Sequence, residues 1–216
     1  FLFDGIPLWG HRLWQALLWI VLTALAAYFL VRRLRLRGWL PNVLTAMTVY
    51  LYLFRGAVYY HLLVPVIVVL AGFDRRKLWR STIVVALASA WAGISRINWY
   101  PVPAMLAIAL YLLEERKGDK PLWRYLSFPA LWSVLGIGIA FGSQALYMFL
   151  SGNQPEQFTS SFSSNLLWYR LWPSAIFRLG LVFSALLVSI PLLWLIVAHL
   201  WRGRGRWSFI RVFGLV

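Results

Sequence analysis

Long apolar stretches alternate along the chain with short segments rich in arginine and lysine. A helix rises about 1.5 Å per residue, so about 20 apolar residues cross a hydrocarbon core of about 30 Å. The pattern predicts a polar loop at residues 151–173 and helices at residues 13–31, 41–54, 57–71, 81–95, 102–113, 125–150 and 174–201. We therefore expect an all-α protein, a polytopic transmembrane helix bundle that forms one domain over residues 1–216.

Two apolar stretches are too long for one crossing and have basic residues on both flanks. Residues 40–72 and 81–113 hold 33 residues each, which would extend for about 50 Å as a single helix. Flanks on the same side of a membrane require an even number of crossings, so each stretch predicts a hairpin of two short helices. The first hairpin turns at Arg55 and Gly56, and the second turns in the proline-containing segment 95–103.

The composition excludes a soluble globular protein. Hydrophobic residues make up 62% of the chain, charged residues 12%, and the mean hydropathy is +0.72. A soluble domain would expose a surface with about 25–35% charged residues. The chain contains no cysteine, and its three histidines lack the spacing of metal ligands, so we expect neither a metal nor a cofactor.

The charge balance is strongly basic, with 21 lysines and arginines against 6 acidic residues. In a soluble protein the net charge of +15 would suggest nucleic-acid binding. In a membrane protein it has another cause, because lysine and arginine accumulate in cytoplasmic loops next to anionic lipid. Sixteen of the basic residues lie in four clusters, at 32–37, 75–80, 116–124 and 202–211. We expect these clusters on the cytoplasmic side of the plasma (inner) membrane, with membrane lipids rather than nucleic acid as partners.

Five arginines are left for the exoplasmic side, against the usual charge bias. They are Arg12, Arg55, Arg96, Arg170 and Arg178. The planar guanidinium stays charged near lipid and binds phosphate through two parallel hydrogen bonds, so we expect these residues to form a phosphate- or lipid-binding site. The alternative for each arginine is structural, with the side chain capping a helix C-terminus or extending to lipid headgroups.

A glycine-rich segment occurs inside the predicted helix 125–150. Gly136, Gly138 and Gly142 lie in apolar sequence with no preceding strand, which argues against a nucleotide-binding loop. The four-residue spacing of Gly138 and Gly142 is typical of a surface where membrane helices pack closely, and we expect that role here.

The order of these elements resembles the GT-C superfamily of integral-membrane glycosyltransferases, which use sugars carried on polyprenyl phosphate. Residues 7–34 are similar to a span of that family that has an arginine near its start and an Arg-Arg cytoplasmic turn at its end. Residues 87–115 resemble its hairpin in which a glycine and an arginine precede prolines, carried here by Gly93, Arg96, Pro101 and Pro103. Residues 128–155 are like its later span that ends in an exoplasmic loop.

The resemblance implies transfer of a sugar from a lipid-phosphate donor to an exoplasmic acceptor. In the family the catalytic carboxylate lies in an exoplasmic loop between spans that would precede Phe1, so we expect this sequence to be part of a longer chain and assign no catalytic residue. Arg96 and Arg55 would hold the departing phosphate, and Arg170 lies on a loop that could close over the substrate. The competing hypothesis is a non-enzymatic accessory or scaffold subunit, with other membrane proteins as partners.

Overall fold

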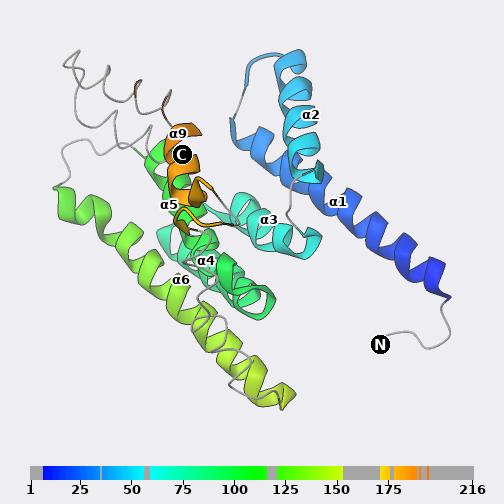
Figure 1. Cartoon of the computed structure of the whole chain (residues 1–216). Helices are drawn as coiled ribbons and strands as arrows, with labels where there is room; N and C mark the ends of the chain where they lie inside the picture. The colour runs from blue at the N-terminus through cyan, green and yellow to red at the C-terminus, as the bar shows by residue number, and fades with distance from the viewer. Residues whose placement is uncertain are drawn as a thin grey trace. The chain divides into compact units, whose positions relative to one another are not determined.

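The computed structural model describes residues 7–34, 36–55, 59–115, 121–152, 171–175, 178–188, 190 and 194 (Figure 1). Within these residues it contains seven α-helices, two short 3₁₀ helices and no strand, which confirms the predicted all-α fold. The chain forms two compact units, residues 1–145 and residues 146–216.

The helices follow the apolar segments of the sequence. In chain order they are α1 (Leu8–Leu34), α2 (Trp39–Arg55), the 3₁₀ helix η1 (Tyr60–Leu62), α3 (Leu63–Gly72), α4 (Leu78–Ser95), the 3₁₀ helix η2 (Ile97–Trp99), α5 (Val102–Glu114), α6 (Leu122–Ser151) and α9 (Gly180–Val188). Helix α6 continues from the first unit into the second, and α9 belongs to the second. Most of the predicted loop 151–173 and much of the predicted helix 174–201 lie outside the described residues.

Four helical stretches of the described part are long and apolar enough to cross a membrane. They are Leu8–Leu34, Leu78–Ser95, Ile97–Glu114 and Leu122–Ser151. The stretch Tyr60–Gly72 is also apolar but shorter. By length and composition, the chain is therefore a membrane protein.

Prolines mark the starts of three helices. Pro41 and Pro65 are each the third residue of their helices, α2 and α3, and Pro103 is the second residue of α5. Proline lacks a backbone N–H, and the first N–H groups of a helix have no partner within it, so proline is tolerated at these positions. The predicted break at residues 95–103 corresponds to the end of α4, the turn η2 and the start of α5.

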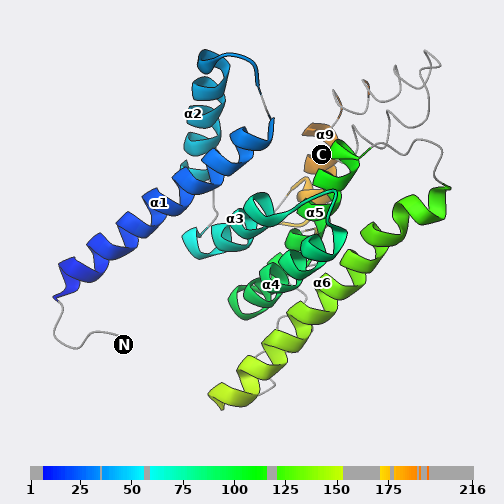
Figure 2. The ribbon, with the colours of Figure 1, turned by 180° about the vertical axis from the view of Figure 1, so that it is seen from behind.

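Helix α4 and the following α5 form an antiparallel pair, as the second hairpin predicts (Figure 1). Helix α3 packs against α1, α4 and α5, whereas α2 packs against α1. The view from behind shows α6 running beside the α4–α5 pair (Figure 2). Consequently α1, α3 and α5 finish at one end of the first unit, where α2, α4 and α6 begin. We call this the inner end and the opposite end the outer end.

Trp132 of α6 is the largest fully buried side chain of the described core. Its indole Nε1 donates a hydrogen bond of 2.9 Å to Thr82 Oγ1 on α4. The rings of Phe73 and Tyr111 meet it edge to face, with centroids 5.6 Å and 5.7 Å away. The indole therefore joins α6 to α4, α5 and the end of α3, with its one donor satisfied.

Helices α4 and α6 approach most closely at Gly93. A Cβ atom at this position would overlap Ser143 Oγ and the backbone carbonyl of Ala140 on α6. Ser143 Oγ also donates a hydrogen bond of 3.0 Å to the carbonyl of Ala90, so the two backbones are linked directly. Only glycine fits at position 93 with this separation of the helices.

The glycines of α6 have different roles from those predicted. A Cβ atom at Gly136 would lie 2.9 Å from Ala104 Cβ and 3.1 Å from Ser89 Oγ, so this glycine lies in a close contact. A Cβ atom at Gly138 or Gly142 would meet no described atom within 4 Å. Within the described residues the close packing surface of α6 therefore includes Gly136, Ala140 and Ser143, whereas no described atom packs closely against Gly138 or Gly142.

Three tryptophans lie at the starts of helices at the inner end. Trp39, Trp79 and Trp123 are the first or second residues of α2, α4 and α6, and they are 76%, 75% and 73% exposed. Amphipathic indole rings prefer the boundary between hydrocarbon and water. Their exposed positions at helix starts are typical of a membrane boundary.

Candidate functional site

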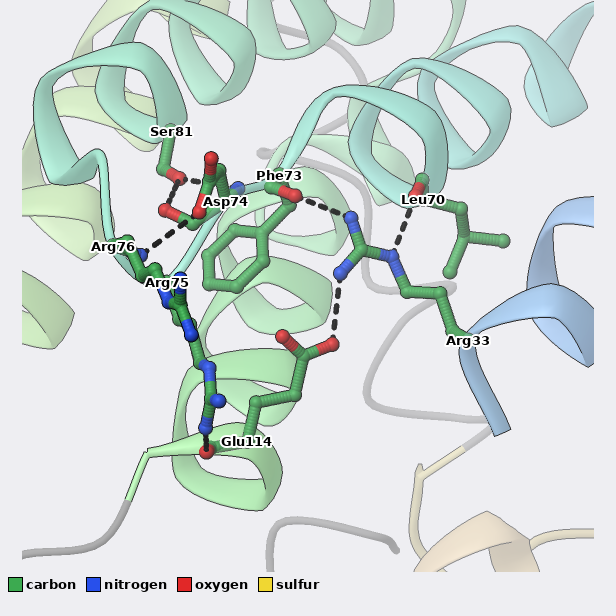
Figure 3. Close-up of polar contacts among 8 residues, drawn as sticks. All are labelled: Arg33, Leu70, Phe73, Asp74, Arg75, Arg76, Ser81 and Glu114. Carbon is green, nitrogen blue, oxygen red and sulfur yellow. Dashed lines mark hydrogen bonds and ion pairs between the residues drawn. The ribbon is translucent and has the colours of Figure 1, made fainter. Parts of the chain in front are cut away.

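Arg33 is the central polar residue of the inner end. Its Nε donates a hydrogen bond of 2.6 Å to the carbonyl of Leu70, and Nη2 donates to the carbonyl of Phe73 (Figure 3). Its Nη1 forms an ion pair of 2.8 Å with Glu114 Oε1. The guanidinium carbon also lies 5.4 Å from the centre of the Phe73 ring. One side chain thus caps the C-terminus of α3 and joins α1 to the ends of α3 and α5.

The turn between α3 and α4 is closed by Asp74. Its backbone N–H donates to Ser81 Oγ at 2.9 Å, and that hydroxyl donates to the Asp74 carbonyl at 2.9 Å. Its carboxylate accepts a hydrogen bond of 2.9 Å from the backbone N–H of Arg76 (Figure 3). That hydrogen bond, helped by one from Lys77 and by nearby cations, lowers the pKa of the Asp74 carboxyl. Asp74 therefore stays ionised at neutral pH and holds the turn.

A second arginine reaches the end of α5. The guanidinium of Arg75 donates a hydrogen bond to the backbone carbonyl of Glu114 (Figure 3). At the start of α6, Tyr125 donates through its hydroxyl to the carbonyl of Glu115 at 3.1 Å. These contacts bring Arg33 and Arg75, of the first two basic clusters, to one end of the first unit, and Arg124 of the third cluster directly precedes Tyr125 there. The fourth cluster lies outside the described residues.

At the outer end, Arg96 follows the last residue of α4. Its guanidinium carbon lies over the ring of Tyr59, 5.2 Å from the centre, and its side chain is exposed. The backbone N–H of Arg96, and not its side chain, donates to the carbonyl of Ala92 at 3.0 Å. The guanidinium therefore does not cap α4, and its N–H groups form no hydrogen bond within the described residues.

The segment beneath Arg96 is held in place by α4. Trp91 Nε1 donates a hydrogen bond of 2.9 Å to the carbonyl of His61 in η1. The rings of Tyr59 and His61 are stacked, with centroids 5.7 Å apart. Residues 59 and 61 thus form an aromatic platform for Arg96, which we call the outer platform.

Arg55 lies close to the outer platform along the chain. It is the last residue of α2 and precedes Tyr59 by four residues, which limits their Cα separation to about 14 Å. Its side chain is exposed and forms no hydrogen bond with described residues.

Arg12 lies near the start of α1, also toward the outer end. Arg12 precedes Trp19 by seven residues, or about two helical turns. The two residues therefore lie on the same face of α1. The Trp19 ring lies 5.4 Å from that of Phe54, the neighbour of Arg55. The described outer end thus carries Arg12, Arg55 and Arg96, although no contact joins their guanidiniums.

The other two predicted site residues belong to the second unit, residues 146–216. Arg170 lies outside the described residues. Arg178 is exposed and precedes α9 in the second unit by two residues. Sequence reasoning missed Tyr59, although its place four residues after Arg55 in an aromatic segment was a usable signal. It also counted Arg33 only as one charge of a cytoplasmic cluster.

Comparison with protein-family models, curated proteins and solved structures finds no match to this chain. The resemblance to GT-C glycosyltransferases therefore stays a hypothesis. Within the described part of the chain, no group of three or more histidine, aspartate or glutamate side chains is placed to hold a metal ion.

Proposed function

We propose that this chain binds a polyprenyl-phosphate sugar at its outer end and takes part in transfer of the sugar to an exoplasmic acceptor, as GT-C glycosyltransferases do. The observation that carries the proposal is the exposed guanidinium of Arg96 on the outer platform. A cation placed at a membrane interface with free donors is suited to an anionic headgroup.

The contact with Tyr59 leaves the N–H donors of the Arg96 guanidinium available to a ligand. The Tyr59 ring interacts with the guanidinium through its π face, and the N–H donors of arginine point outward in the guanidinium plane. Two of these donors match two oxygens of a phosphate. Negative charge on the phosphate grows as the bond to the sugar breaks, so the same hydrogen bonds strengthen during transfer. Arg55, Arg12 and the loop residue Arg170 would add positive charge nearby.

No carboxylate that could act as the general base for this transfer lies among the described residues of the outer end. The described acids are Asp74, Glu114 and Glu115, all at the inner end, whereas Asp4, Asp119 and Glu156 lie outside the described residues. This observation favours the second candidate, an accessory or scaffold subunit that binds the lipid phosphate while another segment or another membrane protein supplies the carboxylate. The two candidates share the phosphate site and differ in whether this chain alone transfers sugar.

Arg96→Lys is expected to weaken binding of polyprenyl phosphate about tenfold or more, because an ammonium group cannot reproduce two parallel hydrogen bonds. The thermal stability should change little, since the charge is kept and the backbone hydrogen bond to Ala92 does not involve the side chain. Binding and melting temperature would be measured on the same detergent-solubilised preparations. Arg124→Lys, at an exposed position near the start of α6, is the matched control and should leave both unchanged.

Unchanged binding in both Arg96→Lys and Arg96→Ala would refute the phosphate site. Loss of stability in Arg96→Ala without selective loss of lipid affinity would assign Arg96 a structural role on Tyr59. A transfer assay with a lipid-linked sugar then separates the two candidates, because only the transferase produces glycosylated acceptor without a partner.

The proposal also requires the inner end to face the cytoplasm and the outer end to face the exoplasm. The chain lacks cysteine, so Arg37→Cys and Asn98→Cys each create one labelling site at an exposed position. A membrane-impermeant maleimide should label Asn98→Cys in intact cells and Arg37→Cys only after permeabilisation. Labelling of both from the same side would overturn this orientation.

A further inference from the structure

An open apolar groove lies between α1 and α2, away from the outer platform. Its volume is about 720 Å³, and its lining is apolar along most of its length, with Ala27, Val31, Val43, Met47 and Leu51 among the lining residues. We call it the α1–α2 groove.

The groove extends from the inner end of the first unit toward the middle of α1. Its lining on α1 extends from Arg32 back to Ala24, a rise of about 12 Å along the helix. The hydrocarbon region of one leaflet is about 15 Å thick. The groove therefore has the length and polarity to hold an acyl chain of one leaflet.

A second hollow at the inner end has the opposite character. Its volume is about 660 Å³, and its charged lining residues are Arg32, Arg33, Arg75, Arg76, Asp74 and Glu114. Four arginines against two carboxylates leave a net charge of +2. We call it the basic cavity.

The arginines of the basic cavity are not equally available. Arg33 and Arg75 donate to the carboxylate and the backbone carbonyl of Glu114. The guanidiniums of Arg32 and Arg76 form no hydrogen bond within the described part of the chain. Arg33 and Arg75 balance the two carboxylates in charge, so the excess positive charge of the hollow is carried by Arg32 and Arg76, whose donors are unused.

Arg32 lines both hollows, so the apolar groove and the basic cavity adjoin at this residue. We propose that together they form a binding site for an anionic phospholipid of the inner-end leaflet. One acyl chain lies in the α1–α2 groove, and the phosphate binds Arg32 and Arg76. The order of the two regions, apolar toward the bilayer centre and cationic at its surface, is the order of chain and headgroup in a phospholipid.

Charge complementarity selects this occupant over a neighbouring helix. An apolar helix could fill the α1–α2 groove but would leave the donors of Arg32 and Arg76 unused, whereas a phosphate accepts hydrogen bonds from both. The site lies at the opposite end of the unit from the outer platform, so it stands independently of the proposed sugar transfer.

Native mass spectrometry of the full chain in micelles containing equal amounts of phosphatidylglycerol and phosphatidylcholine tests the proposal. We expect the wild type to retain phosphatidylglycerol selectively. Combined Arg32→Ala and Arg76→Ala substitutions should reduce its retention at least tenfold. Combined Arg37→Ala and Arg80→Ala substitutions remove the same charge from the same two clusters without touching the cavity, and should keep wild-type retention.

The groove is tested separately by filling it. Ala46 lines the groove on α2, so Ala46→Phe should reduce retention of phosphatidylglycerol at least fivefold. Ala16→Phe, at an exposed site on α1 outside the groove, should have no effect. Melting temperatures of all variants identify any that lose lipid through unfolding. If Ala46→Phe unfolds, Ala46→Ser serves as the comparison at the same position. It keeps the groove open, so it should fold and retain phosphatidylglycerol as the wild type does.

Three results would overturn the proposal. Equal losses in the two arginine pairs would mean that only general positive charge attracts the lipid. Displacement of phosphatidylglycerol by millimolar inorganic phosphate would assign the cavity to a free anion. A dimer that Ala46→Phe dissociates while lipid retention is unchanged would assign the groove to a second copy of the chain.

Discussion

Gly93→Ala is expected to destabilise the first unit more than any other single methyl addition at a described glycine. The added Cβ would overlap both a side-chain oxygen and the backbone carbonyl of Ala140, and a carbonyl within a helix cannot rotate away. Helices α4 and α6 must therefore separate, which also stretches the hydrogen bond from Ser143 to Ala90. Overpacking of this kind costs about 1–3 kcal/mol and more where backbone is involved, so we expect a loss of about 3 kcal/mol.

Gly138→Ala is the matched control, because it adds the same methyl group to a helix interior where no described atom lies within 4 Å. Replacing glycine by alanine in a helix gains up to about 1 kcal/mol of helix propensity, so this variant should be unchanged or slightly more stable. Thermal unfolding in one detergent, followed by circular dichroism, compares the two. Equal melting temperatures for the two variants would show that α4 and α6 do not pack through Gly93.

Arg33→Ala is expected to have the second large effect, a loss of about 2–4 kcal/mol in the free energy of unfolding. The substitution removes hydrogen bonds to two carbonyls at the end of α3 and leaves Glu114, whose side chain is only 29% exposed, without its ion-pair partner. Arg33→Lys should recover only part of the loss, because one ammonium group cannot reach three acceptors from a single position.

Arg37→Ala controls for the charge that Arg33→Ala removes from the same cluster. Arg37 is exposed and forms no hydrogen bond with described residues, so its loss should change stability by less than about 0.5 kcal/mol. Both substitutions alter the charge that orients the chain in the membrane, so the difference between their unfolding curves reports the contacts of Arg33. A difference below experimental error would mean that these contacts do not join α1 to α3 and α5.

The positions of the helices could be predicted from the sequence because they depend on local properties. Apolar length determines which segments can span, and prolines such as Pro41 and Pro103 mark helix starts because of their own covalent geometry. The meeting of Arg33, Arg75 and Arg76, members of the first two basic clusters, at one end of the first unit also follows the charge pattern, because charge acts on each loop as the chain enters the membrane. None of these inferences requires knowledge of which helices touch.

The candidate site could be predicted only in part. The sequence indicates that Arg55 and Arg96 lie at helix ends away from the basic clusters, because each interrupts an apolar stretch. The contact of Arg96 with Tyr59 depends on the packing of η1 against α4, through the hydrogen bond from Trp91 to His61. A contact between residues 37 positions apart cannot be inferred from the local composition of either segment.

The sequence by itself determined that this protein is an all-α membrane protein, which of the described apolar segments form helices, and which arginines depart from the charge pattern. Only the tertiary structure decided which of several similar residues carry the contacts. It selected Arg33 over its neighbours to join three helices, and Gly93 and Gly136 over Gly138 and Gly142 for close packing. The reason is physical: hydropathy and charge act on each segment alone, whereas close packing and hydrogen bonding depend on the distance between helices and on their rotation about their axes.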